Sequence, residues 1–299
     1  MRQIELKALA KINLGLDVLG RRENGYHDVR MVMQSIYLYD DVKIERTKKP
    51  GIEIKTNLYF LPVGENNIAY KAAALLLEEF RIKEGVIITL DKHIPVAAGM
   101  AGGSSNAAAV LFGMNRIFGL GLSQKGLMAR GIKLGADVPY CIMRGTVLAE
   151  GIGEELTELP PMPKCTVLIA KPPISVSTKT VYEALDARKG LNHPDINRLI
   201  EGLETGNLPY IASAMGNVLE EVTIPLHPVI EEIKNEMKTA GALNAMMSGS
   251  GPTVFGLFEN KTQARKAQEK IRNKALAKQV YVTVGIFLYQ YQQYWNSLG

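Results

Sequence analysis

One stretch of the chain, residues 95–109, constrains the fold more than any other. It reads Pro-Val-Ala-Ala-Gly-Met-Ala-Gly-Gly-Ser-Ser-Asn-Ala-Ala-Ala, so a glycine-rich turn runs directly into an alanine-rich segment that favours helix. Glycines let backbone N–H groups approach an anion closely, and the start of a helix adds unpaired amides and the positive end of its dipole. The stretch therefore predicts a phosphate-binding loop, with Ser104 or Ser105 as the helix N-cap or as a hydroxyl directed at a phosphate or its Mg²⁺. The alternative is an ordinary loop between a strand and a helix, where Gly and Ser are also common.

Other nucleotide-binding motifs of known spacing are not present in the sequence. The P-loop pattern Gly-x-x-x-x-Gly-Lys-Ser/Thr does not occur, and no Gly-x-Gly-x-x-Gly opens a helix as in a dinucleotide-binding domain. The stretch 95–109 therefore belongs to a different class of phosphate site.

Length and charge indicate a globular enzyme that acts on a small molecule. With 299 residues, 46% of them hydrophobic, the chain can bury a large core and is expected to form about two domains. The net charge of +5 comes from 35 basic and 30 acidic residues scattered along the chain, which suits an anionic small molecule better than nucleic acid. The densest basic stretch, residues 261–278, is predicted to be the solvated face of a helix.

The cysteines and the apolar segments predict a cytoplasmic protein. Cys141 and Cys165 lie far apart in the sequence, without a Cys-x-x-Cys pair or a Cys/His cluster, so neither a disulfide scaffold nor a zinc site is expected. Lys7 and Lys11 interrupt the apolar N-terminus, and no run of about 18 uncharged apolar residues occurs, so no signal peptide or membrane span is expected.

Apolar periodicity predicts strands interleaved with helices. Helices are expected at residues 68–77 (with Asn67 as N-cap), from Ser123 to near Gly135, and at 178–187, 197–204, 227–240 and 262–274. Strands are expected at 4–8, 12–18, 86–90, 165–170, 244–247, 253–257 and 280–287, and 42–45 with 52–55 should form a hairpin. The proline-rich residues 158–163 are the best candidate for a linker, which gives domains 1–157 and 164–299. The second domain is expected to be an α+β sandwich, and the tail 289–299 either packs on the surface or mediates self-association.

The stretch 95–109 resembles the second motif of the GHMP kinases, the superfamily of galactokinase, homoserine kinase and mevalonate kinase. That motif usually runs Pro, three residues, Gly-Leu, and then a run of small residues that ends in Gly-Ser-Ser. Here Met100 stands in place of the leucine and Ala101 in place of a glycine. Methionine fills an apolar position well, and alanine is acceptable where φ is negative.

Three further segments resemble the same superfamily. Residues 10–27 contain Ala-Lys-Ile-Asn-Leu followed by Gly-Tyr-His, the signature of one branch that phosphorylates a cytidine diphosphate-linked methylerythritol on the non-mevalonate isoprenoid route. Residues 135–139 read Gly-Ala-Asp-Val-Pro as in that branch, and residues 246–255 are similar to a glycine-rich turn that packs against the active site. Each segment alone also has a structural alternative. In residues 10–27, Lys11 could be a surface lysine in a strand and Tyr26-His27 part of an amphipathic turn. Asp137 could cap a turn, and residues 246–255 could form a tight hairpin.

The resemblance implies a fold and catalytic roles. The fold is an α+β, two-domain GHMP kinase fold, with a ribosomal protein S5 domain 2-like N-terminal domain and a ferredoxin-like C-terminal domain. Asp137 takes the role of the group that removes or orients the proton of the acceptor hydroxyl. Lys11 lies beside it, keeps it ionised and shares the developing charge.

The resemblance also implies the ligands. Tyr26 and Tyr182 stack on cytosine, His27 reads its polar edge, and Asn13 hydrogen-bonds near the methylerythritol hydroxyls. Mg²⁺ is held mainly by phosphates and water, with Ser105 as a candidate side chain, and no carboxylate pair at metal-ligand spacing is expected. Nucleic acid and membranes are not expected as partners, and the enzyme is expected to be a monomer or a homodimer. The residues expected to bind ATP are Asn67, Lys92, Pro95, Val96, Ala97, Ala98, Gly99, Met100, Ala101, Gly102, Gly103, Ser104 and Ser105.

Two alternative functions remain open on the sequence. The first is another GHMP kinase, acting on homoserine, mevalonate or a sugar, which leaves Gly25-Tyr26-His27 unexplained. The second is a non-catalytic relative, which leaves the joint presence of Lys11, Asp137 and the loop unexplained.

Overall fold

The computed structural model describes residues 1–285, which form two compact units that are not consecutive halves of the chain. The first unit contains residues 1–10, 38–96 and 101–144, and the second contains residues 11–37, 97–100 and those from 145 onward. The predicted linker 158–163 lies inside the second unit, where Met162 is buried and its N–H donates to Thr146 Oγ1. The change of composition at the prolines therefore does not coincide with the division between the units.

The first unit contains a sheet in which one predicted pairing is wrong. Strand β4 (Gly85–Asp91) runs parallel to β3 (Ile52–Thr56) and antiparallel to β2 (His27–Thr47), so it separates the two strands expected to form a hairpin. Gly85 permits this insertion, because a Cβ there would lie 2.2 Å from the carbonyl oxygen of Lys49. Strand β1 (Gln3–Arg21) continues the order as β3-β4-β2-β1, and it is one strand where two were predicted.

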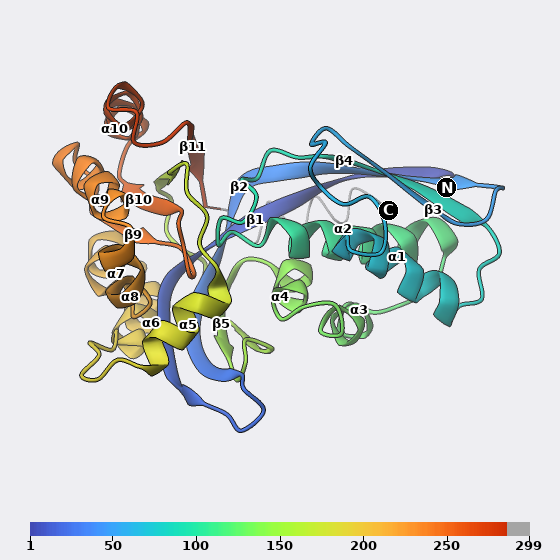
Figure 1. Ribbon diagram of the computed structural model, residues 1–299, viewed down its shortest axis with the longest axis horizontal. Helices are drawn as coiled ribbons and strands as arrows, with labels where there is room; N and C mark the ends of the chain where they lie inside the picture. Colours follow the sequence, from blue (N-terminus) through green and yellow to red (C-terminus); the bar gives the residue numbers. More distant parts are fainter. Residues whose placement is uncertain (286–299) are drawn as a thin grey trace. The chain divides into compact units, whose positions relative to one another are not determined.

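Four helices cover one face of this sheet in the first unit (Figure 1). They are α1 (Ile68–Glu79), α2 (Gly102–Phe118), α3 (Gln124–Gly131) and α4 (Asp137–Met143). The side chain of Asn67 caps α1 as predicted, and Ser123, the predicted start of the next helix, is the N-cap of α3. Helix α2 approaches the sheet closely at Gly113, where a Cβ would lie 2.4 Å from Ile44 Cδ1.

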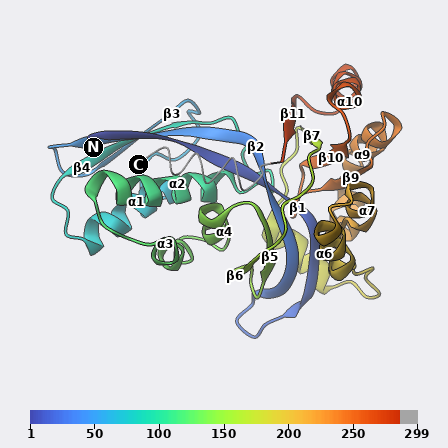
Figure 2. The same cartoon turned by 180° about the vertical axis from the view of Figure 1, so that it is seen from behind.

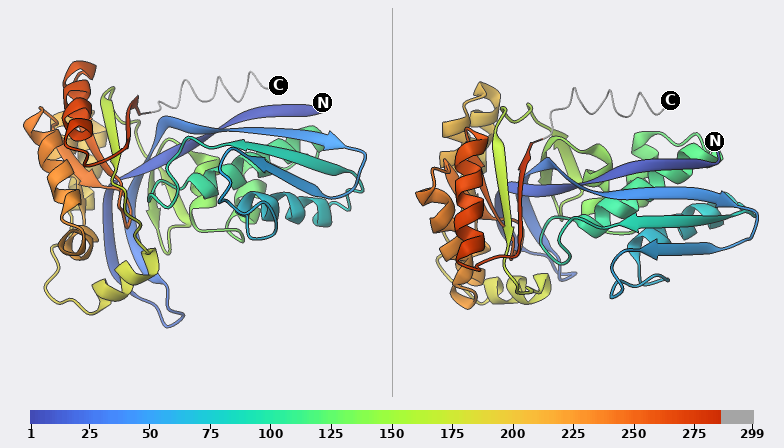
Figure 3. Two further views of the ribbon diagram at one scale, coloured as in Figure 1. Left: turned by 45° about the horizontal axis from the view of Figure 1, so that its top comes forward. Right: turned by 90° about the horizontal axis from the view of Figure 1, so that it is seen from above.

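The second unit contains a four-stranded antiparallel sheet with the order β11-β7-β10-β9. Its strands are β7 (Thr166–Lys171), β9 (Asn244–Met247), β10 (Val254–Phe258) and β11 (Gln279–Val284). Helices α9 (Val229–Thr239) and α10 (Lys261–Asn273) pack on this sheet (Figure 3). Numbered within the sheet, the strand order is 4-1-3-2 with two covering helices, which confirms the ferredoxin-like arrangement.

Two of the remaining strands of the second unit pair with β1 and β2. Strand β5 (Thr146–Glu150) pairs with β2 and with β6 (Glu155–Glu158) (Figure 2). Strand β8 (Gly216–Asn217) pairs in parallel with β1. The helices are α5 (Thr178–Asp186), α6 (Ile196–Thr205), α7 (Leu208–Ala214) and α8 (Glu220–Leu226). The predicted tail 289–299 lies outside the described residues. No helix in residues 1–285 has the length and apolar character needed to cross a membrane.

Candidate active site

The predicted phosphate loop ends in a helix whose N-cap position lies three to four residues earlier than expected. Helix α2 starts at Gly102 with Ala101 at the N-cap position and without a side-chain cap, so the prediction that Ser104 or Ser105 is the N-cap is wrong. The first intrahelical bond runs from Ser105 N–H to the Ala101 carbonyl oxygen at 2.8 Å. The N–H groups of Gly102, Gly103 and Ser104 therefore have no intrahelical acceptor and can bind an anion.

The loop before α2 contains two alanines in a left-handed backbone conformation. Ala97 has φ +51° and Ala101 has φ +55°, whereas Gly99 between them has φ +69°. The condition under which alanine is acceptable at position 101, a negative φ, is therefore not met. An alanine in this region costs about 1–2 kcal/mol relative to its usual conformations. Such strain is typical of loops whose backbone is held in one shape for binding.

Ser105 presents a buried hydroxyl at the start of α2. The residue is 1% exposed, and Oγ has no hydrogen-bond partner among the described residues. Buried hydroxyls nearly always have a partner, so a ligand that supplies one is expected to bind here.

A buried network supports the loop from the preceding segment. Lys92 Nζ contacts Asp40 Oδ2 and donates to Asn106 Oδ1 at 2.6 Å. Asp40 Oδ1 also accepts from the N–H groups of His93 and Ile94, at 2.7 and 2.8 Å. This network ties the residues before the loop to α2. The ammonium of Lys92 is thus engaged within the protein, and its predicted contact with ATP stays a prediction from the resemblance.

Asn67 is likewise engaged in local structure. Its Oδ1 accepts from Ala69 N–H at 2.9 Å as the cap of α1, and its Nδ2 donates to the Pro62 carbonyl oxygen at 2.8 Å. Its predicted contact with ATP is not tested by this geometry.

Lys11 is a buried cation in the second unit with a neutral partner. It is 5% exposed, and Nζ donates to Asn13 Oδ1 at 2.6 Å. The two residues are two apart on β1, so their side chains share one face of the strand. Asn13 Nδ2 lies 3.3 Å from Met31 Sδ, and Lys11 N–H donates to the Met100 carbonyl oxygen at 3.2 Å, which attaches the strand to the loop. No carboxylate pairs with Lys11 among the described residues of this unit.

The C-terminal glycine-rich turn packs against the loop, as expected from the sequence. Ser248 Oγ donates to the Gly99 carbonyl oxygen at 3.1 Å, and a Cβ on Gly99 would lie 2.3 Å from the Ser248 carbonyl oxygen. A Cβ on Gly249 would lie 3.6 Å from Asn13 Oδ1. Only glycine fits at position 99, because a side chain there would meet the backbone of Ser248. The short distance from Gly249 to Asn13 places the turn directly beside the Lys11–Asn13 pair.

Asp137 is the first residue of α4 in the first unit. It is half-buried, and its carboxylate makes no hydrogen bond or ion pair with the described residues of that unit. A carboxylate in the first turn stabilises a helix, which is its structural role. The lack of a fixed partner leaves its oxygens available to a ligand. Its predicted proximity to Lys11 stays a prediction.

The three residues predicted to bind cytidine, Tyr26, His27 and Tyr182, all lie in the second unit, where His27 contacts Tyr182. The Tyr26 side chain is in the turn before β2 and the residue is 59% exposed, as a stacking platform requires. The ring centroids of His27 and Tyr182 are 4.7 Å apart with an interplanar angle of 46°. His27 Nε2 lies 2.7 Å from Asp186 Oδ1, and Arg21 Nη1 lies 3.4 Å from Asp186 Oδ2. Sequence reasoning missed Asp186, although its i+4 spacing from Tyr182 places both on one face of a helix.

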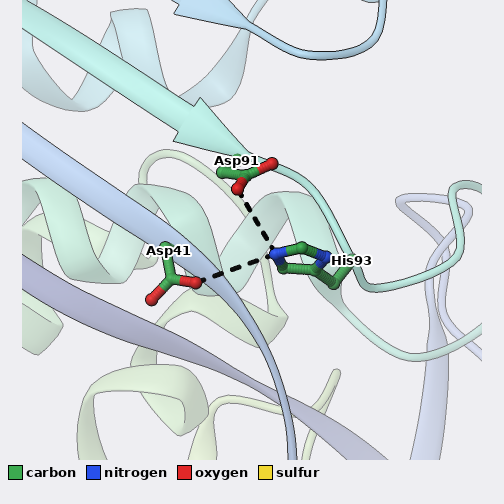
Figure 4. Close-up of side chains that lie close together, drawn as sticks. All are labelled: Asp41, Asp91 and His93. Carbon is green, nitrogen blue, oxygen red and sulfur yellow. Dashed lines mark ion pairs between the residues drawn. The ribbon is translucent and has the colours of Figure 1, made fainter.

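One group of possible metal ligands was also not expected from the sequence. Asp41, Asp91 and His93 bring one ligand atom each within 4.8 Å of one another, and all three are exposed (Figure 4). Asp41 and Asp91 are opposite residues of β2 and β4, so the sheet pairing brings the two carboxylates together. His93 Nε2 lies 3.7 Å from Asp41 Oδ2 and 3.5 Å from Asp91 Oδ2.

Comparisons with known proteins agree with these motifs. The model of the GHMP kinases N-terminal domain matches residues 67–145, and that of the GHMP kinases C-terminal domain matches residues 199–278. A 4-diphosphocytidyl-2-C-methyl-D-erythritol kinase of Lachnospira eligens is 59% identical, covering 95% of this chain and 98% of its own length. The same kinase of Lachnoclostridium phytofermentans is 56% identical over 94% and 96%. A crystal structure of a 4-(cytidine 5'-diphospho)-2C-methyl-D-erythritol kinase superposes with a TM-score of 0.81 at 33% identity, covering 95% of this chain and all of the other.

Proposed function

Because the chain belongs to the GHMP kinases and, within them, to the 4-diphosphocytidyl-2-C-methyl-D-erythritol kinases, we propose the reaction that this membership implies. The enzyme is an ATP-dependent kinase of small molecules. It transfers the γ-phosphoryl group of ATP to the 2-hydroxyl of 4-diphosphocytidyl-2-C-methyl-D-erythritol, a step of the non-mevalonate route to isoprenoid precursors.

The observation that best supports this chemistry is the buried ammonium of Lys11. A buried charge is costly unless it is paired, and here the partner within its unit is the neutral Asn13. An anion supplied by the substrates or by a catalytic carboxylate offsets that cost. A transferring phosphoryl group develops negative charge at such a position, and a fixed ammonium stabilises it.

In the proposed step, Asp137 accepts a hydrogen bond from the 2-hydroxyl of the acceptor. The hydroxyl oxygen forms a bond to the γ-phosphorus, its proton passes to the Asp137 carboxylate, and the bond from the γ-phosphorus to the β–γ bridging oxygen breaks. The electron pair of that bond leaves with ADP. Lys11 stabilises the charge on the oxygens between donor and acceptor.

The loop and α2 supply the phosphate site in this proposal. The N–H groups of Gly102, Gly103 and Ser104 donate to phosphate oxygens. Contacts of Lys11 and Ser248 with the loop backbone help to keep it in its strained shape. The Ser105 hydroxyl, which has no partner among the described residues, suits a phosphate oxygen or a Mg²⁺ ion. Mg²⁺ would be held mainly by the phosphates and would neutralise their charge.

Cytosine is proposed to stack on Tyr26 and Tyr182, with His27 at its polar edge. Stacking of a base on an aromatic side chain contributes about 1–3 kcal/mol and tolerates any base, so selectivity has to come from hydrogen bonds. Asn13 is proposed to hydrogen-bond near the methylerythritol hydroxyls while it holds Lys11.

The test compares three acceptors with ATP and Mg²⁺. We expect rapid phosphorylation of 4-diphosphocytidyl-2-C-methyl-D-erythritol and no measurable turnover of homoserine or mevalonate. Comparable kcat/KM for homoserine or mevalonate would instead support another GHMP kinase. Tight ATP binding without turnover of any acceptor would support a non-catalytic relative.

Two further properties, the location and the oligomeric state, belong to the proposal. The two cysteines described are both free and buried, which supports a reducing, cytoplasmic location. We propose a monomer or a homodimer, which sedimentation analysis would decide.

A further inference from the structure

The pair formed by His27 and Asp186 defines the state of the histidine ring. His27 Nε2 lies 2.7 Å from Asp186 Oδ1, and the His27 side chain is 10% exposed. An ionised carboxylate can only accept hydrogen bonds, so the ring must carry its proton on Nε2. Arg21 Nη1 lies 3.4 Å from the other oxygen of Asp186.

Helix α5 places the Asp186 side chain next to His27. Tyr182 and Asp186 are four residues apart, so both lie on the helix face that contacts His27. Val181 and Leu185 are buried and occupy the neighbouring face. Asp186 is the last residue of α5, where the helix dipole disfavours a carboxylate, so helix stability does not account for an aspartate there.

The other ring nitrogen of His27 is the one left for a ligand. Nδ1 has no hydrogen-bond partner among the described residues. With the proton on Nε2, a neutral ring offers Nδ1 as an acceptor. Cytosine presents an amino group, a donor, at its 4-position, whereas uracil presents a carbonyl oxygen, an acceptor, at the same place. An acceptor at Nδ1 therefore favours cytosine over uracil.

We propose that Asp186 is a positioning residue that fixes the Nε2–H tautomer of His27, so that Nδ1 accepts a hydrogen bond from the amino group of cytosine. Asp186 acts through His27 and does not itself contact the substrate. This inference rests on the proposed function, because it assumes a cytidine-bearing substrate next to His27.

The kinetic test uses Asp186→Asn, which keeps the shape of the side chain. An amide can accept from or donate to Nε2, so it no longer selects one tautomer. We expect the ratio of kcat/KM for the cytidine diphosphate-linked substrate to that for its uridine analogue to fall about tenfold, through KM, while kcat and the KM for ATP stay within twofold. Glu183→Gln is the matched control, because Glu183 lies on the same helix and its one ion pair among residues 1–285 is with Lys179, at 3.8 Å. It should leave the ratio unchanged.

The tautomer can be measured without any effect on activity. The chain has four histidines, so ¹⁵N-labelled histidine gives a spectrum simple enough to assign His27 by comparison with His27→Gln. We expect the Nε2–H tautomer in the unaltered protein and a mixture in Asp186→Asn. An Nδ1–H tautomer in the unaltered protein would overturn the inference, whatever the variants do.

The two proposals fail in different ways. In one outcome, the unaltered enzyme phosphorylates the cytidine substrate, and the Asp186→Asn variant discriminates between the cytidine and uridine substrates as well as the parent does. This outcome leaves the proposed function standing and removes the role of Asp186. An unaltered enzyme that does not phosphorylate the cytidine substrate removes both.

Discussion

The left-handed backbone at Ala101 predicts that Ala101→Gly stabilises the protein. An alanine at φ +55° costs about 1–2 kcal/mol, which glycine avoids. Glycine also has more freedom in the unfolded chain, which costs about 0.4–1 kcal/mol. The difference leaves a gain of about 0.5–1 kcal/mol in the free energy of unfolding. Since about 1 kcal/mol shifts the midpoint by about 2–8 °C depending on domain size, thermal unfolding can resolve it.

The matched control for this prediction is Ala108→Gly. Ala108 lies inside the same helix, is 2% exposed and has an ordinary helical backbone. Glycine there costs about 1 kcal/mol in helix propensity, and the lost methyl group costs about 0.8 kcal/mol more. The two alanine-to-glycine changes should therefore have opposite signs. A destabilisation by Ala101→Gly as large as that by Ala108→Gly would show that the loop is not strained at this position.

The remaining predictions concern the site and one thiol. Asp137→Asn should lower kcat by two or more orders of magnitude with both substrates still bound within several-fold, and steady-state kinetics that retain kcat within tenfold would remove its role. Lys11→Met should slow turnover more than it weakens binding, because the charge acts mainly on the transition state; an increase in KM alone would assign Lys11 to ground-state binding. Tyr26→Ala and Tyr182→Ala should each raise the KM for the cytidine substrate about 5- to 100-fold while the KM for ATP is unchanged, and unchanged kinetics would exclude stacking. Burial raises the pKa of the Cys165 thiol to about 12, so a thiol reagent at pH 8 should modify it only after unfolding; rapid labelling of the native protein would contradict this.

Local sequence signals predicted most elements but not their pairing. The caps Asn67 and Ser123 stand where their helices begin, because a cap depends on residues within one turn. The predicted hairpin of 42–45 and 52–55 was wrong, because β4 comes from a distant segment and displaces the local partner. Strand alternation shows that residues pair, but it does not show with which strand.

The start of α2 was misplaced for a different reason. Serine is a common N-cap, so the sequence favoured Ser104 or Ser105 over Ala101. Tertiary contacts instead fix the backbone before α2, since Asp40 holds the N–H groups of His93 and Ile94. Alanine then adopts a conformation that its own propensity disfavours.

The partners of the predicted site residues could not be predicted from the sequence either, because they are also tertiary contacts. Asp40 lies 52 positions before Lys92, and Asp186 lies 159 positions after His27. A single sequence carries motif residues at recognisable spacing, but their partners have no fixed offset. The sequence therefore proposed Lys92 and His27 as site residues, whereas their partners Asp40 and Asp186 were found only from the fold.

The turn at residues 248–251 contacts both the proposed phosphate loop and the helix proposed to bind cytidine. Ser248 holds the carbonyl oxygen of Gly99 in the loop, and Ser250 Oγ lies 2.9 Å from Thr178 Oγ1 at the start of α5. A nucleotide that immobilises the loop and a cytidine that immobilises α5 would both restrict the motion of residues 248–251. The conformational entropy that this turn loses when the first ligand binds is then not lost again when the second binds. Thermodynamic linkage makes any such cooperativity reciprocal: each substrate would tighten the binding of the other by the same factor, whichever binds first.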